Sequence, residues 1–432
     1  MQEKNQKIIK ANILHSIDLN KVELISNVYI LIDGKGIIQE ILRLVEDINL
    51  DDFEYLDYSE YLITPGFIDL HTHLPQTFAR GIGDLELMDW LDNFIFPEEM
   101  KLLNPNYAKL CSEIFFNSLI NYGTTTAMVY TSTFKEPAEI SFEVAKDKNI
   151  RVFMGNTMMD FPNKHGLFLS KDENLKISEY LIYKYHKSNK EKVNYIFTPR
   201  FAGSCSSELM LEIGKIANEK GILIQTHLSE NQSEIEYIKS LYTNFDTYTD
   251  IYEKHNLLLN NTILAHSIYL NNNEIETLLK HNCSIAHCPN SNRFLQSGIM
   301  PTKKYLSKNL NIGLGTDIGA GYSFSILNEM KETIENSKIM KMLNKNIEDI
   351  NPIISLENAF YLGTLGAAKS ISMNDKIGNI RVGKFADFLV FELNPLKYKS
   401  ETNQNQRLLS ELIYKSENQI PKYVFSQGER LK

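Results

Sequence analysis

The sequence predicts an α/β protein with a TIM-like (β/α)8 barrel at its centre and a small β-sandwich domain built from both termini. Three observations support this prediction. Apolar runs alternate with longer amphipathic stretches through the middle of the chain, both ends carry short strand patterns instead, and histidines recur where the apolar runs stop. Alternating strand and helix patterns are typical of a parallel sheet. A length of 432 residues suits one barrel of about 250 residues with insertions and a smaller satellite domain.

Eight apolar runs are the candidate barrel strands. Most are separated by helical patterns, as in the amphipathic stretch over 106–122, which Gly123 ends. Parallel neighbours need such crossover connections, so a closed barrel is the simplest arrangement. The eight runs are 63–73, 124–130, 151–157, 195–199, 222–228, 262–268, 284–288 and 312–316.

The two ends of the chain resemble each other more than they resemble the middle. Short strand patterns at 12–14 and 28–32 lead into a turn at 33–36, and the tail carries an apolar run at 388–391. We therefore expect both ends to pair in one domain beside the barrel. The predicted division is 1–62 for its N-terminal part, 63–374 for the barrel and 375–432 for its C-terminal part.

Composition excludes several function classes. A net charge of -9 and a pI of about 5.7 argue against nucleic acid or an anionic membrane as a partner. The sequence contains no run of about 18 apolar residues, so we expect no membrane-spanning helix. Residues 1–5 also lack the basic segment followed by an apolar one that is typical of a secretory signal. Four cysteines are too few for a disulfide scaffold, so we expect buried thiols in a cytoplasmic protein: Cys111, Cys205, Cys283 and Cys288.

Chemistry-bearing side chains collect at the predicted C-terminal ends of the barrel strands, where barrel enzymes carry their active sites. Five of the ten histidines and one aspartate fall there. Chance placement explains one or two such positions but not six. They are His71 and His73 after the first strand, then His227, His266, His287 and Asp317 after the last four.

His71 and His73 point to the same face of a strand because they are two residues apart. Imidazoles with one carboxylate suit zinc or ferrous iron, and an open position on such an ion lowers the pKa of a water toward 7. Such chemistry needs a proton shuttle, and Glu230 lies three residues past His227. We favour Asp317 as ligand and base over helix cap, whereas His266 is a ligand or a hydrogen-bond partner of the water.

Together these residues resemble the amidohydrolase superfamily. The match runs from the segment 65–73 through His227 and His266 to 315–317, with the spacing of the mononuclear deaminase and chlorohydrolase branch. The resemblance implies a barrel of the metal-dependent hydrolase type. It also implies that His266 hydrogen-bonds the attacking water. For His287, the residues alone favour a packing role or one that supports the ligands from behind. Segment 198–201 offers no lysine for carboxylation, which argues against the dinuclear branch. The implied zinc ligands are His71, His73, His227 and Asp317.

Within the branch, the chain resembles the guanine deaminase family most. The matching segments are 73–76, 89–91, 96–99, 198–201, 227–231, 286–292 and 321–323. This implies hydrolysis of guanine to xanthine and ammonia by a zinc-activated water, and a homodimer. One departure is 317–321, where the family usually has a Gly-Gly pair before the tyrosine. The alternatives are another aminohydrolase of the branch, such as a thioadenosine, S-adenosylhomocysteine or triazine hydrolase, and an inactive scaffold, which should have lost ligands.

Four further residues are expected to bind the purine base. Arg200 offers a planar fork of hydrogen-bond donors that suits a purine carbonyl and ring nitrogen. The same fork is unsuited to adenine, whose exocyclic amine is itself a donor at that position. Gln76 supplies a donor and an acceptor, and Trp90 and Phe201 can sandwich the ring. The resemblance adds base contacts from His227, Glu230 and Asp317. The competing readings are a surface ion pair for Arg200, a loop amide for Gln76 and core packing for both aromatic residues.

Overall fold

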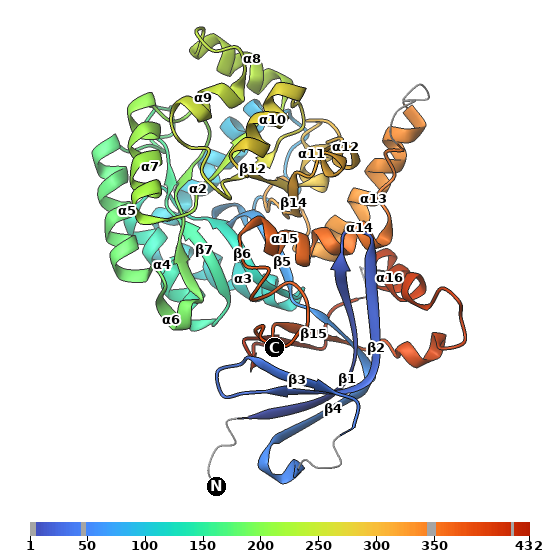
Figure 1. Cartoon of the computed structure of the whole chain (residues 1–432). Coiled ribbons are helices and arrows are strands. Elements are labelled where there is room, and N and C mark those ends of the chain that lie inside the picture. Colours follow the sequence, from blue (N-terminus) through green and yellow to red (C-terminus); the bar gives the residue numbers. More distant parts are fainter. Residues whose placement is uncertain (1–5, 45–48, 344–350, 416–418) are drawn as a thin grey trace.

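The computed structural model describes residues 6–44, 49–343, 351–415 and 419–432, so the N-terminal stretch 1–5 lies outside it. Figure 1 shows a helix-wrapped barrel above a β-sheet domain in which both ends of the chain meet. Within the described residues, no helix combines the length and apolar character needed to cross a bilayer. All four cysteines are buried and unpaired, as predicted.

The barrel strands form two parallel four-stranded sheets, and each of the eight predicted runs overlaps one of these strands, although the fourth run, 195–199, shares only Tyr195 with its strand. One short extra pair, β8 (Thr157–Met158) and β10 (Thr198–Pro199), continues the third and fourth runs. The first sheet contains β5 (Phe67–His73), β6 (Thr124–Tyr130), β7 (Arg151–Gly155) and β9 (Val193–Tyr195). The second contains β11 (Gln225–Leu228), β12 (Ile263–His266), β13 (Ser284–His287) and β14 (Asn311–Leu314).

Backbone hydrogen bonds connect the two sheets at both seams. A parallel bridge between Phe197 and Ile224 joins the first sheet to β11. On the other side, the N–H of Asp317 donates to the carbonyl of His71 at 2.8 Å, just beyond β14 and within β5. The eight strands therefore surround one interior, and their carboxyl ends share one rim.

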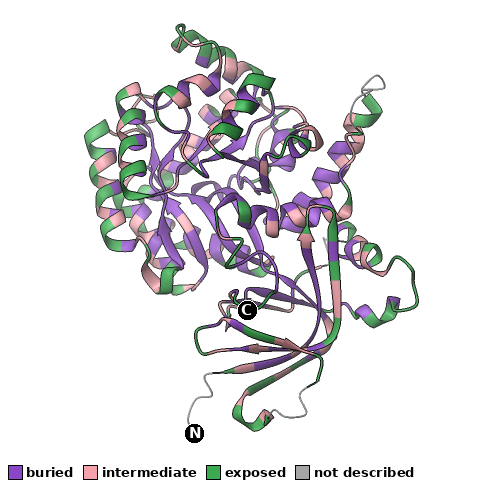
Figure 2. Cartoon of the chain, viewed as in Figure 1, coloured by how far each residue is buried: buried purple, intermediate pink, exposed green. Residues whose placement is uncertain are grey.

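Helices cover the outside of the barrel, and Figure 2 shows buried strands behind helices with exposed outer faces. The predicted helix over 106–122 is α3 (Pro105–Asn121), capped by the side chain of Asn104 and followed by Gly123 with φ of +91°. The α-helices that follow α3 are α4 (Lys135–Asp147), α5 (Lys171–Tyr185), α6 (Ser188–Glu191), α7 (Ser207–Lys220), α8 (Gln232–Leu241), α9 (Tyr248–Lys254), α10 (Asn272–Lys280), α11 (Pro289–Phe294), α12 (Thr302–Ser307), α13 (Ile326–Leu343), α14 (Leu356–Leu362), α15 (Leu365–Ser370) and α16 (Gln404–Tyr414).

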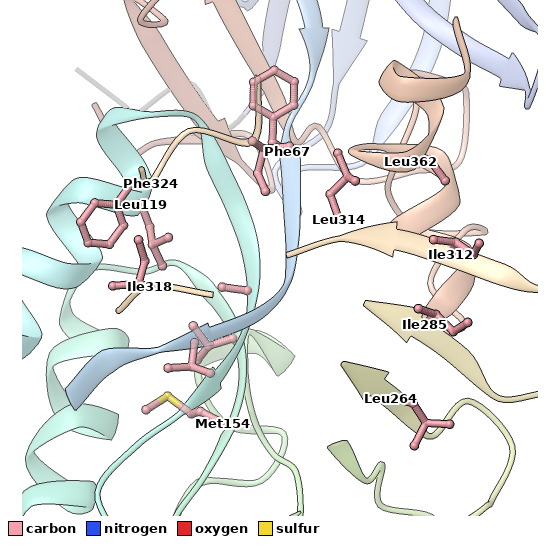
Figure 3. Packing of buried hydrophobic residues seen from close by; sticks show 14 of the residues in the cluster. Phe67, Leu119, Met154, Leu264, Ile285, Ile312, Leu314, Ile318, Phe324 and Leu362 are labelled. Atoms are coloured by element: carbon pink, nitrogen blue, oxygen red, sulfur yellow. The ribbon is translucent and has the colours of Figure 1, made fainter. Parts of the chain in front are cut away.

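The core follows the two-residue period of the strands. On β12, Leu264 packs in the large cluster beneath the helices, while Ile263 and Ala265 belong to a different cluster. Figure 3 shows Leu264 with Ile285 and Ile312, which project in the same way from successive strands. This alternation uses one face of each strand to hold the helices and leaves the other for the barrel interior.

The second domain is one seven-stranded sheet made from both ends of the chain, which confirms a separate β-sheet domain. The order β17-β16-β15-β4-β1-β2-β3 places C-terminal strands beside N-terminal ones. Strand β4 extends past residue 62, the predicted limit, and we retain the three-part division as a proposal. The bounds are β1 (Lys7–Asp18), β2 (Lys21–Ile32), β3 (Ile38–Leu42), β4 (Glu54–Pro65), β15 (Phe388–Phe391), β16 (Tyr423–Ser426) and β17 (Glu429–Arg430).

A buried ion pair fastens this sheet to the barrel. Arg151 on β7 donates to the carboxylate of Asp387, which lies just before β15, and both side chains are almost fully buried. The backbone carbonyl of Asp387 also accepts from the N–H of Gly66 at 3.0 Å. The start of β5, and hence the strand that carries His71 and His73, is held from below by the second domain.

Candidate active site

The structure brings the predicted histidines and Asp317 together at the carboxyl rim of the barrel. Three of the residues where the chain leaves a strand have left-handed backbone: Ser229 (φ +48°), His266 (φ +66°) and Asp317 (φ +47°). Non-glycine residues rarely adopt this conformation, and such strain concentrates at functional sites. The sharp turns carry these groups over the mouth of the barrel.

Four of the six separations among His71, His73, His227 and Asp317 are close to the edge lengths of a tetrahedral metal site. The Nε2 atoms of His71 and His73 are 3.2 Å apart, and that of His227 is 3.3 Å from His73. The Oδ1 atom of Asp317 lies 3.2 Å from the Nε2 atoms of both His71 and His73. Zinc–nitrogen bonds of about 2.0–2.1 Å give tetrahedral edges of about 3.3–3.4 Å, so a cation of that size fits.

The protonation states also suit a cation. The Nδ1 of His227 contacts the carbonyl of Arg200 at 2.6 Å and must donate to it, which leaves Nε2 with a lone pair. Burial lowers the pKa of His71 to about 3 and that of His227 well below its usual value. Burial opposes ionisation of Asp317, but hydrogen bonds with His71 and His73 hold its pKa well below the ordinary range. The neutral imidazoles of His71 and His227 thus lie close to the ionised carboxylate of Asp317.

Glu230 and His266 lie side by side next to this cluster. The Nε2 of His266 is 3.4 Å from Oε2 of Glu230 and 3.9 Å from Oδ2 of Asp317. Its Nδ1 meets Oδ1 of Asn292 at 2.7 Å, so Nε2 is left to accept a hydrogen bond. Neither that Nε2 nor Oε1 of Glu230 has a hydrogen-bond partner in the described part of the chain. Buried polar atoms without a partner are rare in proteins, so both atoms are candidates to contact a substrate or the attacking water.

The pKa of Glu230 is raised well above its ordinary value. Burial is the main cause, and the negative charges of Asp317 and Glu234 add to it. Glu234 also accepts the backbone N–H of Glu230 at 2.9 Å, which fixes the turn after β11. A carboxyl group with a raised pKa can take up a proton and later release it near neutral pH.

A pocket opens beside the cluster, with about 440 Å³ of empty space including its mouth. Every predicted substrate-binding residue lines it, so the structure places them together: Gln76, Trp90, Arg200, Phe201, His227, Glu230 and Asp317. His73 and His266 line it as well, whereas His71 lies deeper and His287 lies behind, 3.4 Å from the hydroxyl of Thr302.

Arg200 and Gln76 meet on the carboxylate of Glu99. The Nη1 and Nη2 atoms of Arg200 donate to its two oxygens at 2.9 and 3.0 Å. The amide nitrogen of Gln76 donates to Oε1 of the same carboxylate at 2.9 Å. Arg200 thus forms a buried ion pair, with its guanidinium 5.0 Å from the centre of the Phe96 ring. The surface alternative considered for Arg200 is wrong.

Residues 77–103, which we call the lid, cover the pocket after the first strand. They contain α1 (Leu87–Trp90), a π-helical turn (Leu91–Ile95) and α2 (Phe96–Met100). Trp90 is buried, and its indole N–H donates to the carbonyl of Ile82 at 2.7 Å. It packs with other lid residues and Ala320. π-Helical turns occur often at functional sites.

The departure noted at 317–321 falls at this contact. Ala320 packs its methyl group against the lid cluster that contains Trp90. Gly319 has φ of +129°, and a Cβ there would stand 1.9 Å from Oε1 of Gln76. The loop after the eighth strand therefore shapes the pocket wall, and the departure does not change any of the proposed metal ligands.

Sequence reasoning missed several residues that support the site. Ser291 donates to Oδ2 of Asp317 at 2.6 Å, and Asn292 orients His266. Both lie in the segment 286–292 that carried part of the resemblance, and Glu99 lies in 96–99. The sequence thus indicated these segments, but it did not show which of their residues contact the site.

The chain matches a known family, several characterised proteins and several solved structures. The model of the amidohydrolase family matches residues 62–431. Guanine deaminase from Dictyostelium discoideum is 32% identical over 99% of this chain and 98% of its own length. That of Escherichia coli strain K12 is 35% identical over 83% of this chain and 80% of its own.

Among solved structures, guanine deaminase from C. acetobutylicum, determined with guanine bound in its active site, superposes with a TM-score of 0.90. It is 33% identical and covers 98% of this chain and 99% of its own. Both full-length matches span the lid, the rim and the β-sheet domain alike. The chain belongs to the amidohydrolase family and, within it, to the guanine deaminases.

Proposed function

We infer that this chain hydrolyses guanine to xanthine and ammonia. One observation carries this inference. The histidines and Asp317 that could hold a metal ion lie beside the hydrogen-bond donors of Arg200 and Gln76 in one pocket. Two relatives that match nearly all of the chain at 32–33% identity are guanine deaminases, and one of them is solved with guanine in its active site.

We propose that one zinc ion per chain is held by His71, His73, His227 and Asp317. His73 lies 3.2–3.3 Å from the ligand atoms of the other three, and the lowered pKa values of His71 and His227 also support this assignment. Ferrous iron suits the same donors, and supply often decides between such metals. The metal would supply the Lewis acidity that makes an attacking water acidic at neutral pH.

The pocket then orients the base. Arg200 keeps three of its five N–H groups free of Glu99, and these suit the carbonyl O6 and ring nitrogen N7 of guanine. Gln76 reads the neighbouring edge, and Trp90 and Phe201 lie against the ring faces. In this orientation C2 of guanine faces Glu230 and His266, and the reaction becomes effectively unimolecular.

Proton transfers follow from the carboxylates. Glu230 takes one proton from the attacking water and delivers it to N3 as oxygen bonds to C2. Asp317 takes the second water proton and passes it to the amino group, which leaves as ammonia. His266 accepts a hydrogen bond from the water through its free Nε2. The two carboxylates have opposite pKa shifts, which suits separate acid and base roles.

The experiment is ammonia release from guanine, guanosine, adenine and adenosine, each with zinc-loaded and chelator-stripped protein. We expect release from guanine alone, only with metal, and restored when zinc is added back. Release from adenosine or thioadenosine with guanine inert would overturn the assignment to guanine and the roles of Arg200 and Gln76. Activity that survives verified metal removal would overturn the metal site.

Other features of the family are proposals of a coarser kind. We propose a homodimer on the family resemblance, and light scattering of the purified chain tests it. The cytoplasmic location stays a prediction from the sequence.

A further inference from the structure

The lid carries the one carboxylate that binds both residues proposed to recognise the base. Glu99 lies on α2, and its two oxygens accept from Nη1 and Nη2 of Arg200 at 2.9 and 3.0 Å. The same Oε1 accepts from the amide of Gln76 at 2.9 Å. A residue 101 positions before Arg200 thus fixes the orientation of its guanidinium.

This pair is buried and electrically balanced. The side chains of Arg200 and Glu99 are 3% and 4% exposed, so water screens neither charge. An unpaired cation in such a place attracts anions strongly, because the local dielectric constant is low. With Glu99 in place, the wall that faces the base carries donors but no net charge.

Gln76 is held at both ends of its amide. Its nitrogen donates to Glu99, which orients the amide, and its oxygen lies where only a glycine leaves room, beside Gly319. The amide therefore cannot turn over without losing a buried hydrogen bond. Through one carboxylate, the lid sets the donor pattern of both side chains.

We propose that Glu99 is a positioning residue that makes the pocket selective for a neutral oxopurine over an anionic one. It aims the fork of Arg200, fixes the amide of Gln76 and cancels the charge of the guanidinium. This inference rests on the proposed function, because it takes guanine as the substrate of the same pocket.

Glu99→Gln separates charge from shape. The amide keeps the size of the side chain but presents N–H₂ where one oxygen accepted from Arg200, so two donors face each other. The guanidinium then gains freedom to rotate and keeps an uncancelled charge. Guanine should bind less well, whereas urate, an oxopurine anion at neutral pH, should bind better.

The test measures kcat and KM for guanine and the inhibition constant of urate in zinc-loaded wild type, E99Q and E98Q. Glu98 is the matched control, since it is the adjacent glutamate of α2 and its oxygens bond Lys101 and Tyr107 instead. For E99Q we expect KM to rise at least about tenfold with kcat within about threefold. The inhibition constant of urate should fall at least about tenfold, and E98Q should resemble wild type.

If wild type is active and E99Q and E98Q have the same KM for guanine and the same inhibition constant of urate, this inference is wrong and the proposed function still stands. Wild type inert on guanine would instead overturn the proposed function. E99D keeps the charge with a shorter side chain, so it should raise KM without tighter urate binding. Trp90 fluorescence and thermal unfolding show whether E99Q folds, and E99D decides the question if it does not. Tighter binding of urate by E99D than by wild type would contradict the charge argument.

Discussion

Removing the carboxylate of Asp69 should destabilise the barrel at the seam between its first and last strands. Asp69 on β5 is fully buried and accepts from the backbone N–H groups of His71 at 3.2 Å and Thr316 at 3.0 Å. It also accepts from the hydroxyl of Thr316 at 2.6 Å. Asp69→Ala leaves two buried N–H groups unpaired, which costs about 1–3 kcal/mol each, or about 2–6 kcal/mol in total.

The same change should weaken metal binding, because Asp69 holds the backbone between two proposed ligands, His71 and Asp317. We expect a loss of about 10–100-fold in zinc affinity, as for other partners that orient metal ligands. Asp69→Asn keeps one acceptor oxygen and should lie between wild type and D69A on both measures.

The assay is urea unfolding in chelator, followed by Trp90 fluorescence, together with zinc competition against a coloured chelator. Asp52→Ala, an exposed aspartate in the β-sheet domain, is the control and should change the unfolding free energy by less than about 0.5 kcal/mol. A D69A variant as stable as D52A, with unchanged zinc affinity, would refute the seam argument.

Two further predictions concern the pocket wall and a buried lysine. Gly319→Ala should raise KM for guanine at least about tenfold, because its Cβ would collide with the amide of Gln76. Gly383→Ala is the kinetic control, because Gly383 also has a positive φ (+86°) but its Cβ would meet open space. Equal KM values for the two variants would count against the contact with Gln76. Burial lowers the pKa of Lys192 from 10.5 to about 8, so between these values the unfolded chain binds the extra proton and stability rises with pH. Relative to Lys192→Met, wild type should therefore gain about 2.5 kcal/mol of unfolding free energy between pH 8 and pH 10.4. A pH-independent difference between the two proteins would contradict the assignment.

The barrel strands were predictable because they are short, mostly buried runs with polar groups at or just after their ends. The predicted run 124–130 coincides with β6, and 388–391 with β15. Strand β1 runs over Lys7–Asp18, although only 12–14 was predicted, because polar residues interrupt its apolar pattern. Its Asn12 lies at a register shift, where its side-chain amide donates to the carbonyl of Ser59 at 2.6 Å. Such polar positions are satisfied by distant backbone, which a local pattern does not reveal.

The rim histidines were predictable for a geometric reason, since parallel strands present their carboxyl ends at one edge. The partners of the site were not. Glu99 meets Arg200 only because the lid folds back over the barrel, and Ser291 meets Asp317 across two neighbouring strand ends. Acidic and hydroxyl residues are common in loops, so their identity as partners depends on tertiary structure alone. The sequence thus indicated the reacting groups, and the structure adds the residues that hold them.

The most direct test of the central claim is guanine turnover by Glu230→Gln, measured as ammonia release with the metal content of the same sample. Glu236→Gln, an exposed glutamate six residues along the chain on α8, is the matched control. We predict that E230Q loses at least about 100-fold in kcat with its metal content unchanged, while E236Q behaves as wild type. Retention of wild-type turnover by metal-loaded E230Q would contradict the role of Glu230 in moving the proton to guanine.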